Sequence, residues 1–353
     1  MTRFHKKYAV RTLAGALLSA GLAFSAAAQD LIKFDGVTAQ GGPTAQMFPI
    51  YVAQEMGYYE EEGLDVTLNY SKGSSDAARQ LAAENVDWGI FASAAAMITV
   101  QRGFPLKAIM QIYYPDSFDI VVPADSDIQT VADMKGKVIG VSDLAGGEVP
   151  MTRASILESG LKEGADVSLV IAGEGDPTTV RSFTEGRIQA YAGAKRDLLL
   201  LPAQDIPTRS ITPAAITRFP GDALTVRAET FEEDKELLVK FVRATIKGWA
   251  WGMANKDETF ELLKTKYAEA SLGDNPVAAE FWELVQTYYT APEGVEPHGV
   301  FLPDAWEFYM DYLLVGEGDQ QALAGPVDIA SILTDEIVEM AWDGLDISTV
   351  TGE

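Results

Sequence analysis

Residues 31–70 read LIKFDGVTAQGGPTAQMFPIYVAQEMGYYEEEGLDVTLNY, and this stretch indicates the fold class. Strands are expected over Leu31–Val37 and Leu64–Tyr70, because both are short apolar or alternating segments next to turn residues. Between them, Ala45–Met56 carries apolar residues at helical spacing, and Gly57 is placed to end that helix. A strand, a helix and a second strand in this order predict a βαβ unit in a largely parallel sheet.

The same alternation continues along the chain. Helices are expected at Asp76–Glu84, Ala94–Arg102, Pro150–Leu161 and Thr178–Gly186, with a helical turn at Val131–Lys135. The further expected strands are Val86–Phe91, Lys107–Tyr113, Phe118–Val122, Lys137–Val141, Val167–Ile171, Ala190–Ala194 and Leu224–Val226. Beyond this last strand the period is helical, over Phe231–Tyr267, Pro276–Tyr289, Pro303–Leu314 and Asp328–Trp342.

The pattern predicts an α/β protein with two lobes. The chain would cross between them twice, near Tyr114–Pro123 and near Arg218–Val226. We expect residues 29–118 and 223–353 to form a discontinuous lobe I, whose C-terminal part is helical, and 119–222 to form lobe II. A two-domain enzyme with a single crossing, and with the helical third as a separate bundle, remains open at this point.

Residues 1–28 have the features of a secretory signal. Four basic residues precede an apolar run, and small residues at Ala26 and Ala28 suit cleavage before Gln29. The alternative is a membrane anchor, but the apolar run is short for a bilayer span of about 20 residues. A lipid anchor would need a cysteine, and the chain has none. We therefore expect an exported protein without a stable membrane anchor, most simply a periplasmic one.

The composition of the 353 residues is that of a globular protein, with 47% hydrophobic residues, but the formal net charge is −25. Removal of residues 1–28 would take four basic residues and no acidic ones with it, and would leave −29. Such a charge opposes nucleic-acid binding. An anionic ligand would have to be met by a local cluster of basic groups.

No recognised catalytic motif is present, so an enzyme is not expected. After the signal segment the only histidine is His298, which leaves no centre for a catalytic triad or a histidine metal site. We expect no cofactor and no metal. A pair of carboxylates that meet only in the fold, as in glycosidases, remains open.

Four turns rich in glycine and serine follow predicted strands: Gln40–Thr44, Ser71–Ser75, Phe91–Ala94 and Leu144–Glu148. Ligands of open α/β sheets bind beyond the carboxyl ends of the strands, where small residues let them approach the backbone. Each turn alone is explained as well by helix capping. Four turns that converge on one cleft favour a binding site.

The predicted ligand-binding residues come from these turns and from neighbouring polar or aromatic positions. Tyr113 and Tyr114 could stack on a ring, while Lys72, Lys195 or Arg196 could neutralise an anionic group. The complete predicted set is Gln40, Gly42, Thr44, Met47, Lys72, Gly73, Ser74, Ser75, Phe91, Ala92, Ser93, Tyr113, Tyr114, Asp116, Leu144, Gly146, Gly147, Glu174, Gly193 and Lys195.

Five segments together resemble a known family. They are IYVAQEMGYY (50–59), EGLDV (62–66), LAAENVDWGI (81–90), DSDI (125–128) and VADMKGKVIGV (131–141). In this order they are similar to the periplasmic substrate-binding proteins of nitrate/sulfonate/taurine ABC transporters, the NMT1/THI5-like family. The resemblance implies a type II-like periplasmic binding protein fold, with a ligand cleft between two lobes and contacts at the four turns.

The resemblance also implies a role. Members of the family carry a small molecule to a membrane permease and its ATPase partner, and we expect this chain to do so as a monomer. The implied ligand is a sulfonate-like or taurine-like anion, or an aromatic related to the thiamine pyrimidine. Alternatives are an enzyme like the pyrimidine-precursor synthases and a ligand sensor for a membrane receptor. The cysteine cluster typical of the synthase branch is absent.

Overall fold

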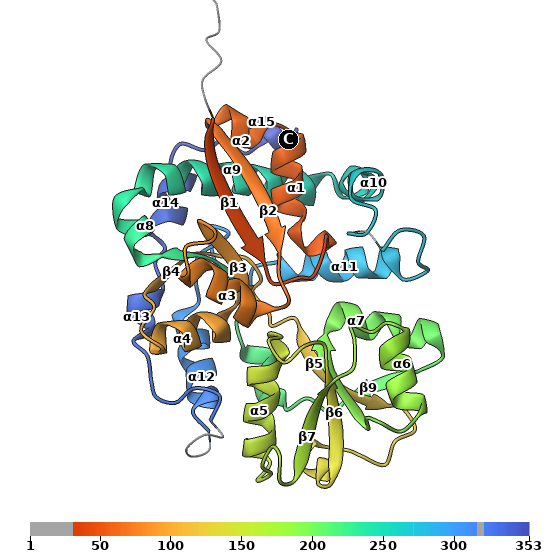
Figure 1. Cartoon of the computed structure of the whole chain (residues 1–353). Coiled ribbons are helices and arrows are strands. Elements are labelled where there is room, and N and C mark those ends of the chain that lie inside the picture. The colour runs from red at the N-terminus through yellow and green to blue at the C-terminus, as the bar shows by residue number, and fades with distance from the viewer. Residues whose placement is uncertain (1–30, 271, 316–320, 353) are drawn as a thin grey trace, which may run out of the picture. The chain divides into compact units, whose positions relative to one another are not determined.

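The computed structural model describes residues 31–270, 272–315 and 321–352 (Figure 1). The expected signal segment, 1–28, lies outside these residues. None of the helices in the described ranges is long and apolar enough to cross a membrane.

A first five-stranded sheet contains both strands of residues 31–70. Its order is β2-β1-β3-β10-β4, with β1 (Ile32–Thr38), β2 (Leu64–Tyr70), β3 (Trp88–Ala92), β4 (Leu106–Gln111) and β10 (Asp222–Arg227). β1 runs parallel to β2 and β3, which confirms the βαβ prediction. β10 returns from far along the chain and pairs antiparallel with both β3 and β4. The sheet is therefore mixed.

A second five-stranded sheet has the order β7-β6-β8-β5-β9, and repeats this mixture of parallel and antiparallel pairs. Its strands are β5 (Phe118–Pro123), β6 (Lys137–Val141), β7 (Val167–Ile171), β8 (Ala190–Ala194) and β9 (Thr208–Ser210). β6 pairs parallel with β7 and β8, while β5 pairs antiparallel with β8 and β9. Three-residue β9 was not predicted, because it is too short to show a period. The α/β class is confirmed.

A helix lies in each predicted range, but Phe231–Tyr267 is divided into three helices, and the helices at Tyr58–Glu61, Lys195–Leu200 and Ser348–Thr351 were not predicted. Before β10 the helices are η1 (Ala45–Met47), α1 (Phe48–Glu55), α2 (Tyr58–Glu61), α3 (Ser74–Ala82), α4 (Ser93–Gln101), η2 (Val131–Met134), α5 (Glu148–Glu158), α6 (Pro177–Thr184), α7 (Lys195–Leu200), η3 (Pro202–Gln204) and η4 (Ala214–Arg218). After it come α8 (Ala228–Glu233), α9 (Lys235–Ala254), α10 (Lys256–Lys266), α11 (Ala278–Tyr288), α12 (Pro303–Leu313), α13 (Ile329–Ile332), α14 (Glu336–Trp342) and α15 (Ser348–Thr351).

The helical C-terminal third packs into the core of the first sheet instead of forming a separate bundle. Phe241 of α9 is fully buried, with its ring 5.1 Å from that of Phe34 and 4.8 Å from that of Trp88. Trp88 is buried in the strand core as expected, and its indole N–H donates to the carbonyl of Phe34 at 3.2 Å. Burial of such aromatic surface is the dominant favourable term for this unit.

Two segments connect the sheets, and they run side by side. Gly221 N donates to the carbonyl of Tyr113 at 3.1 Å, and Asp116 N donates to that of Phe219 at 3.0 Å. α12 packs against α4, which lies between strands of the first sheet. It also packs against α5, which lies between strands of the second sheet, and against η4. β5 begins at Phe118 and β10 at Asp222. The lobe boundaries given above stay a prediction.

Candidate functional site

A cavity of about 300 Å³ lies where turns from both sheets meet, and we call it the central cavity. Its lining residues are Ala39, Gln40, Gly41, Gly42, Pro43, Gln46, Lys72, Gly73, Ser74, Ser117, Phe118, Ser142, Gly146, Gly147, Glu148, Glu174, Ala194, Arg196, Asp197, Asp222 and Glu269. Most of them follow the carboxyl ends of parallel strands, where the backbone of an open α/β sheet leaves a crevice.

Eight of the predicted site residues line the central cavity: Gln40, Gly42, Lys72, Gly73, Ser74, Gly146, Gly147 and Glu174. They come from the turns after β1, β2, β6 and β7. The turns after β2 and β6 are in contact, since Ser75 N donates to the carbonyl of Ala145 at 3.1 Å. The structure thus brings three of the four predicted turns together, from both sheets, while the turn Phe91–Ala94 does not line the cavity.

Twelve predicted residues do not line the central cavity: Thr44, Met47, Ser75, Phe91, Ala92, Ser93, Tyr113, Tyr114, Asp116, Leu144, Gly193 and Lys195. The turn after β3 is buried in the core, where Ser93 Oγ donates to the carbonyl of Pro220 at 3.0 Å. Thr44 caps η1 by accepting from Gln46 N. Ser75 and Leu144 face outward, and Leu144 is 51% exposed.

The two tyrosines predicted to stack on a ligand are core residues. Tyr113 is fully buried, and its hydroxyl donates to the carbonyl of Gln46 at 3.1 Å. The hydroxyl of Tyr114 accepts from Gly299 N at 2.8 Å. Burial raises the pKa of both phenols. Tyr113 therefore supports the cavity wall from behind, through Gln46, and presents no face to the cavity.

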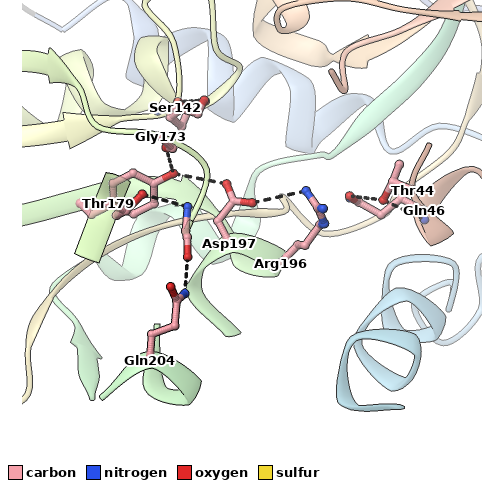
Figure 2. Close-up of polar contacts among 11 residues, drawn as sticks. Thr44, Gln46, Ser142, Gly173, Thr179, Arg196, Asp197 and Gln204 are labelled. Atoms are coloured by element: carbon pink, nitrogen blue, oxygen red, sulfur yellow. Dashed lines mark hydrogen bonds and ion pairs between the residues drawn. The ribbon is translucent and has the colours of Figure 1, made fainter. Parts of the chain in front are cut away.

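Of the three predicted cations, Lys195 is engaged elsewhere. Its Nζ donates to the carbonyl of Asp116 at 2.9 Å, and the two residues line a separate cavity of about 220 Å³. Lys72 and Arg196 remain at the central cavity. Arg196 is the second residue of α7, and Figure 2 shows its guanidinium group beside Asp197.

Four carboxylates that the sequence reading did not select also line the central cavity: Glu148, Asp197, Asp222 and Glu269. Glu148 is 2% exposed and accepts from Ser142 Oγ at 2.6 Å and Ser142 N at 2.9 Å. Burial raises the pKa of this carboxyl group. Glu269 is exposed, like the predicted Glu174.

The two buried aspartates of the central cavity differ in their partners. Asp197 accepts from the hydroxyl of Tyr191 at 3.3 Å and lies 3.7 Å from Arg196 (Figure 2). Burial raises its pKa to about 7, against the lowering effect of Arg196. Asp222 is 3% exposed. No described residue donates a hydrogen bond to its carboxylate or forms an ion pair with it. Burial, then the charge of Asp116, raises the pKa of Asp222 to about 7.

His298 lies outside the central cavity, beside the aromatic residues of the C-terminal helices. Its ring stacks on that of Trp249 at 3.8 Å, and neither ring nitrogen has a hydrogen-bond partner among the described residues. Burial lowers its pKa to about 3, so the imidazole is neutral. Within the described ranges, no group of three or more acidic or histidine side chains is arranged to hold a metal ion.

The sequence and the fold have counterparts in known proteins. The chain is 26% identical over 304 residues to the riboflavin-binding protein RibY of Chloroflexus aurantiacus, covering 84% of this chain and 83% of the relative. It is 23% identical over 295 residues to a formylaminopyrimidine-binding protein of Halalkalibacterium halodurans, covering 83% and 88%. The structure is similar to that of the alkanesulfonate-binding protein SsuA from Xanthomonas axonopodis pv. citri, with a TM-score of 0.62 and 17% identity over 88% of this chain and 99% of that one.

The structural similarity shows the periplasmic binding protein fold expected from the sequence. The family assignment rests on the sequence itself. A family model described as NMT1/THI5 like matches residues 44–259, which include the turns after β2, β6 and β7 and part of α10. The chain belongs to the NMT1/THI5-like family.

Proposed function

We propose that this protein is the solute-binding component of an ABC importer, which captures one small molecule and delivers it to a membrane permease and its ATPase partner. The central cavity carries the proposal, because strand-end turns of both sheets form its wall. A ligand there would contact both sheets at once and would exclude water from its polar contacts. Export to a periplasm, action as a monomer and the lobe boundaries 118/119 and 222/223 belong to the same proposal.

The size of the cavity limits the ligand to a small organic molecule. About 300 Å³ is at the lower end of the range found for small-molecule sites. The two relatives that match over most of the chain are named for riboflavin and for formylaminopyrimidine, and both are named as binding proteins. Their names favour a nitrogen heterocycle over a simple inorganic anion, and favour binding over catalysis.

A ligand that copurifies with the protein is the direct test. We expect mass spectrometry of the denatured, purified protein to find one small organic compound in near-stoichiometric amount. Adding that compound at 100 times its dissociation constant should stabilise the protein by about 2.7 kcal/mol, seen as a rise in melting temperature. If neither a copurified compound nor any nitrogen heterocycle, sulfonate, vitamin or organic acid stabilises the protein, the proposal is wrong.

The contact between the turns after β2 and β6 gives a second prediction. Gly73 has φ +133°, and a Cβ there would lie 2.6 Å from the carbonyl oxygen of Ala145. We expect Gly73→Ala to force these turns apart and to weaken ligand binding about tenfold or more, measured by calorimetric titration. Gly103→Ala is the matched control, because Gly103 has φ +90° but open space around its Cα. Equal affinities of the two variants would contradict the prediction.

A further inference from the structure

The central cavity has an excess of acidic side chains. Five carboxylates line it, against the two cations Lys72 and Arg196. Lys72 is exposed to solvent, and Arg196 lies 3.7 Å from Asp197, so neither forms an ion pair with Asp222. The local charge therefore has the same sign as the net charge of −25, and opposes an anionic ligand instead of attracting it.

Acidic residues at a surface are commonly solvated, so the excess alone defines no site. Asp222 is different, because 97% of it is buried, it lines the cavity, and its carboxylate has no partner among the described residues. Buried carboxylates are normally hydrogen-bonded, since an unpaired one loses its hydration without compensation. Asp222 lines the cavity, so a donor bound there can reach this group.

Asp116 provides a useful contrast. It is 6% exposed and lies on the other crossing segment, outside the central cavity. Its Oδ1 accepts from Phe118 N at 3.0 Å, so its partner is already supplied by the chain. Two aspartates of similar burial thus differ in their position relative to the cavity and in their hydrogen bonding. Only Asp222 needs a donor that the described residues do not supply.

We propose that the ligand is a small organic cation whose N–H group donates to the carboxylate of Asp222. This inference rests on the proposed function. A bare metal ion fits less well, because no described group of three or more acidic or histidine side chains is arranged to hold one. An organic cation, such as a protonated amine, an amidine or a protonated aminoheterocycle, supplies both the charge and the directional donor.

The proposal also gives the sign of the pH dependence of binding. The titratable groups with an electrostatic effect on or from Asp222 are Asp116 and the phenols of Tyr113, Tyr288 and Tyr289, and burial keeps the phenols neutral. The charged and titratable groups that line the same cavity are Lys72, Glu148, Glu174, Arg196, Asp197 and Glu269. Asp222 has a pKa of about 7 without ligand, and a cation requires its ionised form. Affinity for a cation should therefore fall as the pH decreases from 8 to 5, while affinity for an anion should rise.

Three isosteric probes separate the charges. Benzamidine is a cation with N–H donors, benzamide is neutral and benzoate is an anion. We expect calorimetric titration or a melting-temperature shift to give at least tenfold tighter binding of benzamidine than of the other two at pH 8. Benzoate binding as tightly as benzamidine, or no response to any of the three, would overturn the inference.

Two matched variants test the residue. Asp222→Asn should weaken benzamidine binding about 10- to 100-fold at pH 8, because a neutral amide replaces the charged acceptor. It should also reduce the pH dependence to the part that Asp197 contributes, since that carboxyl group lines the same cavity and has a pKa of about 7. Asp116→Asn removes a charge of similar burial that lies outside the cavity lining. Asp116 acts on Asp222 by raising its pKa, so the comparison is made at pH 8, where Asp222 is ionised in the parent and in the variant, and the affinity should change less than threefold. Equal losses in both variants would overturn the role of Asp222. If the copurified compound proves to be an anion, the inference fails and the proposed function stands; if nothing binds at all, both fail.

Discussion

Replacement of Trp306 by alanine is expected to lower the free energy of unfolding by about 3–5 kcal/mol. Trp306 lies in α12 and is fully buried. Its indole N–H donates to Oε1 of Gln111 at 3.1 Å. The substitution removes a large apolar side chain from the core and also leaves this buried amide oxygen without its donor.

The cost should be large because Gln111 connects α12 to both crossing segments. Gln111 Nε2 donates to the carbonyl of Tyr113 at 2.7 Å and to that of Asp222 at 3.1 Å. Loss of Trp306 would therefore make the backbone at Asp222 less firmly held, since the hydrogen bond from Gln111 would no longer be fixed in place. We expect urea denaturation of the variant to show a lower midpoint.

Trp251→Ala is the matched control for this prediction. Trp251 lies in α9 and is only partly buried, so the same substitution removes less buried surface. We expect a loss of about 1–2 kcal/mol. A loss below 1 kcal/mol for Trp306→Ala, or equal losses for the two variants, would show that Trp306 does not link the helix to the crossings.

The strands could be predicted from the sequence with little error where short apolar segments stand between turn residues. Leu64–Tyr70, Lys137–Val141 and Val167–Ile171 have the same bounds in the structure as in the prediction. Strand direction was harder. β10 is antiparallel because the chain re-enters the first sheet from the second, and a local period contains no information about that return.

Three of the four turns predicted from the sequence line the central cavity. Turns with glycine and serine at strand ends do line the central cavity, since only such residues let neighbouring loops approach closely. The side chains were harder, because burial is a property of the tertiary structure. Tyr113 and Tyr114 look like stacking groups on one strand end, yet both are covered by the helical C-terminal third, where Tyr288 and Gly299 lie.

The missed carboxylates have a different cause. The chain has 52 Asp and Glu residues, so the presence of an acidic residue does not by itself indicate a binding site. Asp222 follows Pro220-Gly221 and looks like an ordinary turn residue. A signal was present, since the chain crosses between sheets at this point and ligands of this fold class bind near the crossings. The local sequence could not show that Asp222 lacks a partner.

Stability without ligand should increase as the pH is lowered from 8 to 5. Burial raises the pKa of Asp116, Asp197 and Asp222 from 3.8 to about 7 in the folded protein. Between about pH 4 and 7 the folded state thus holds protons that the unfolded state has lost, so stability falls as the pH rises through this range. A pKa shift of one unit corresponds to about 1.4 kcal/mol of stability. Counting one unit of the shift at each of the three aspartates, the free energy of unfolding should be about 4 kcal/mol higher at pH 5 than at pH 8.

His298 acts in the opposite direction. Its folded pKa is about 3 against a usual 6.5, so the unfolded state takes up a proton first as the pH falls. This costs up to about 1.4 kcal/mol for each pH unit below 6.5, less than the combined gain from three aspartates. We therefore expect the highest melting temperature near pH 4 to 5, lower than is usual for globular proteins.

Two substitutions separate these contributions. Asp222→Asn should raise the melting temperature at pH 8 and flatten the profile between pH 5 and 8, because a neutral amide replaces a carboxylate that loses its hydration. His298→Phe keeps a flat ring against Trp249 and should extend the stable range to lower pH. Melting temperatures measured from pH 4 to 9 check both. A parent protein that is less stable at pH 5 than at pH 8, with an unchanged slope in Asp222→Asn, would mean that Asp222 is ionised in both the folded and the unfolded state across this range. Burial would then not have removed its hydration or its partners, and the argument that this carboxylate needs a donor from the ligand would fail.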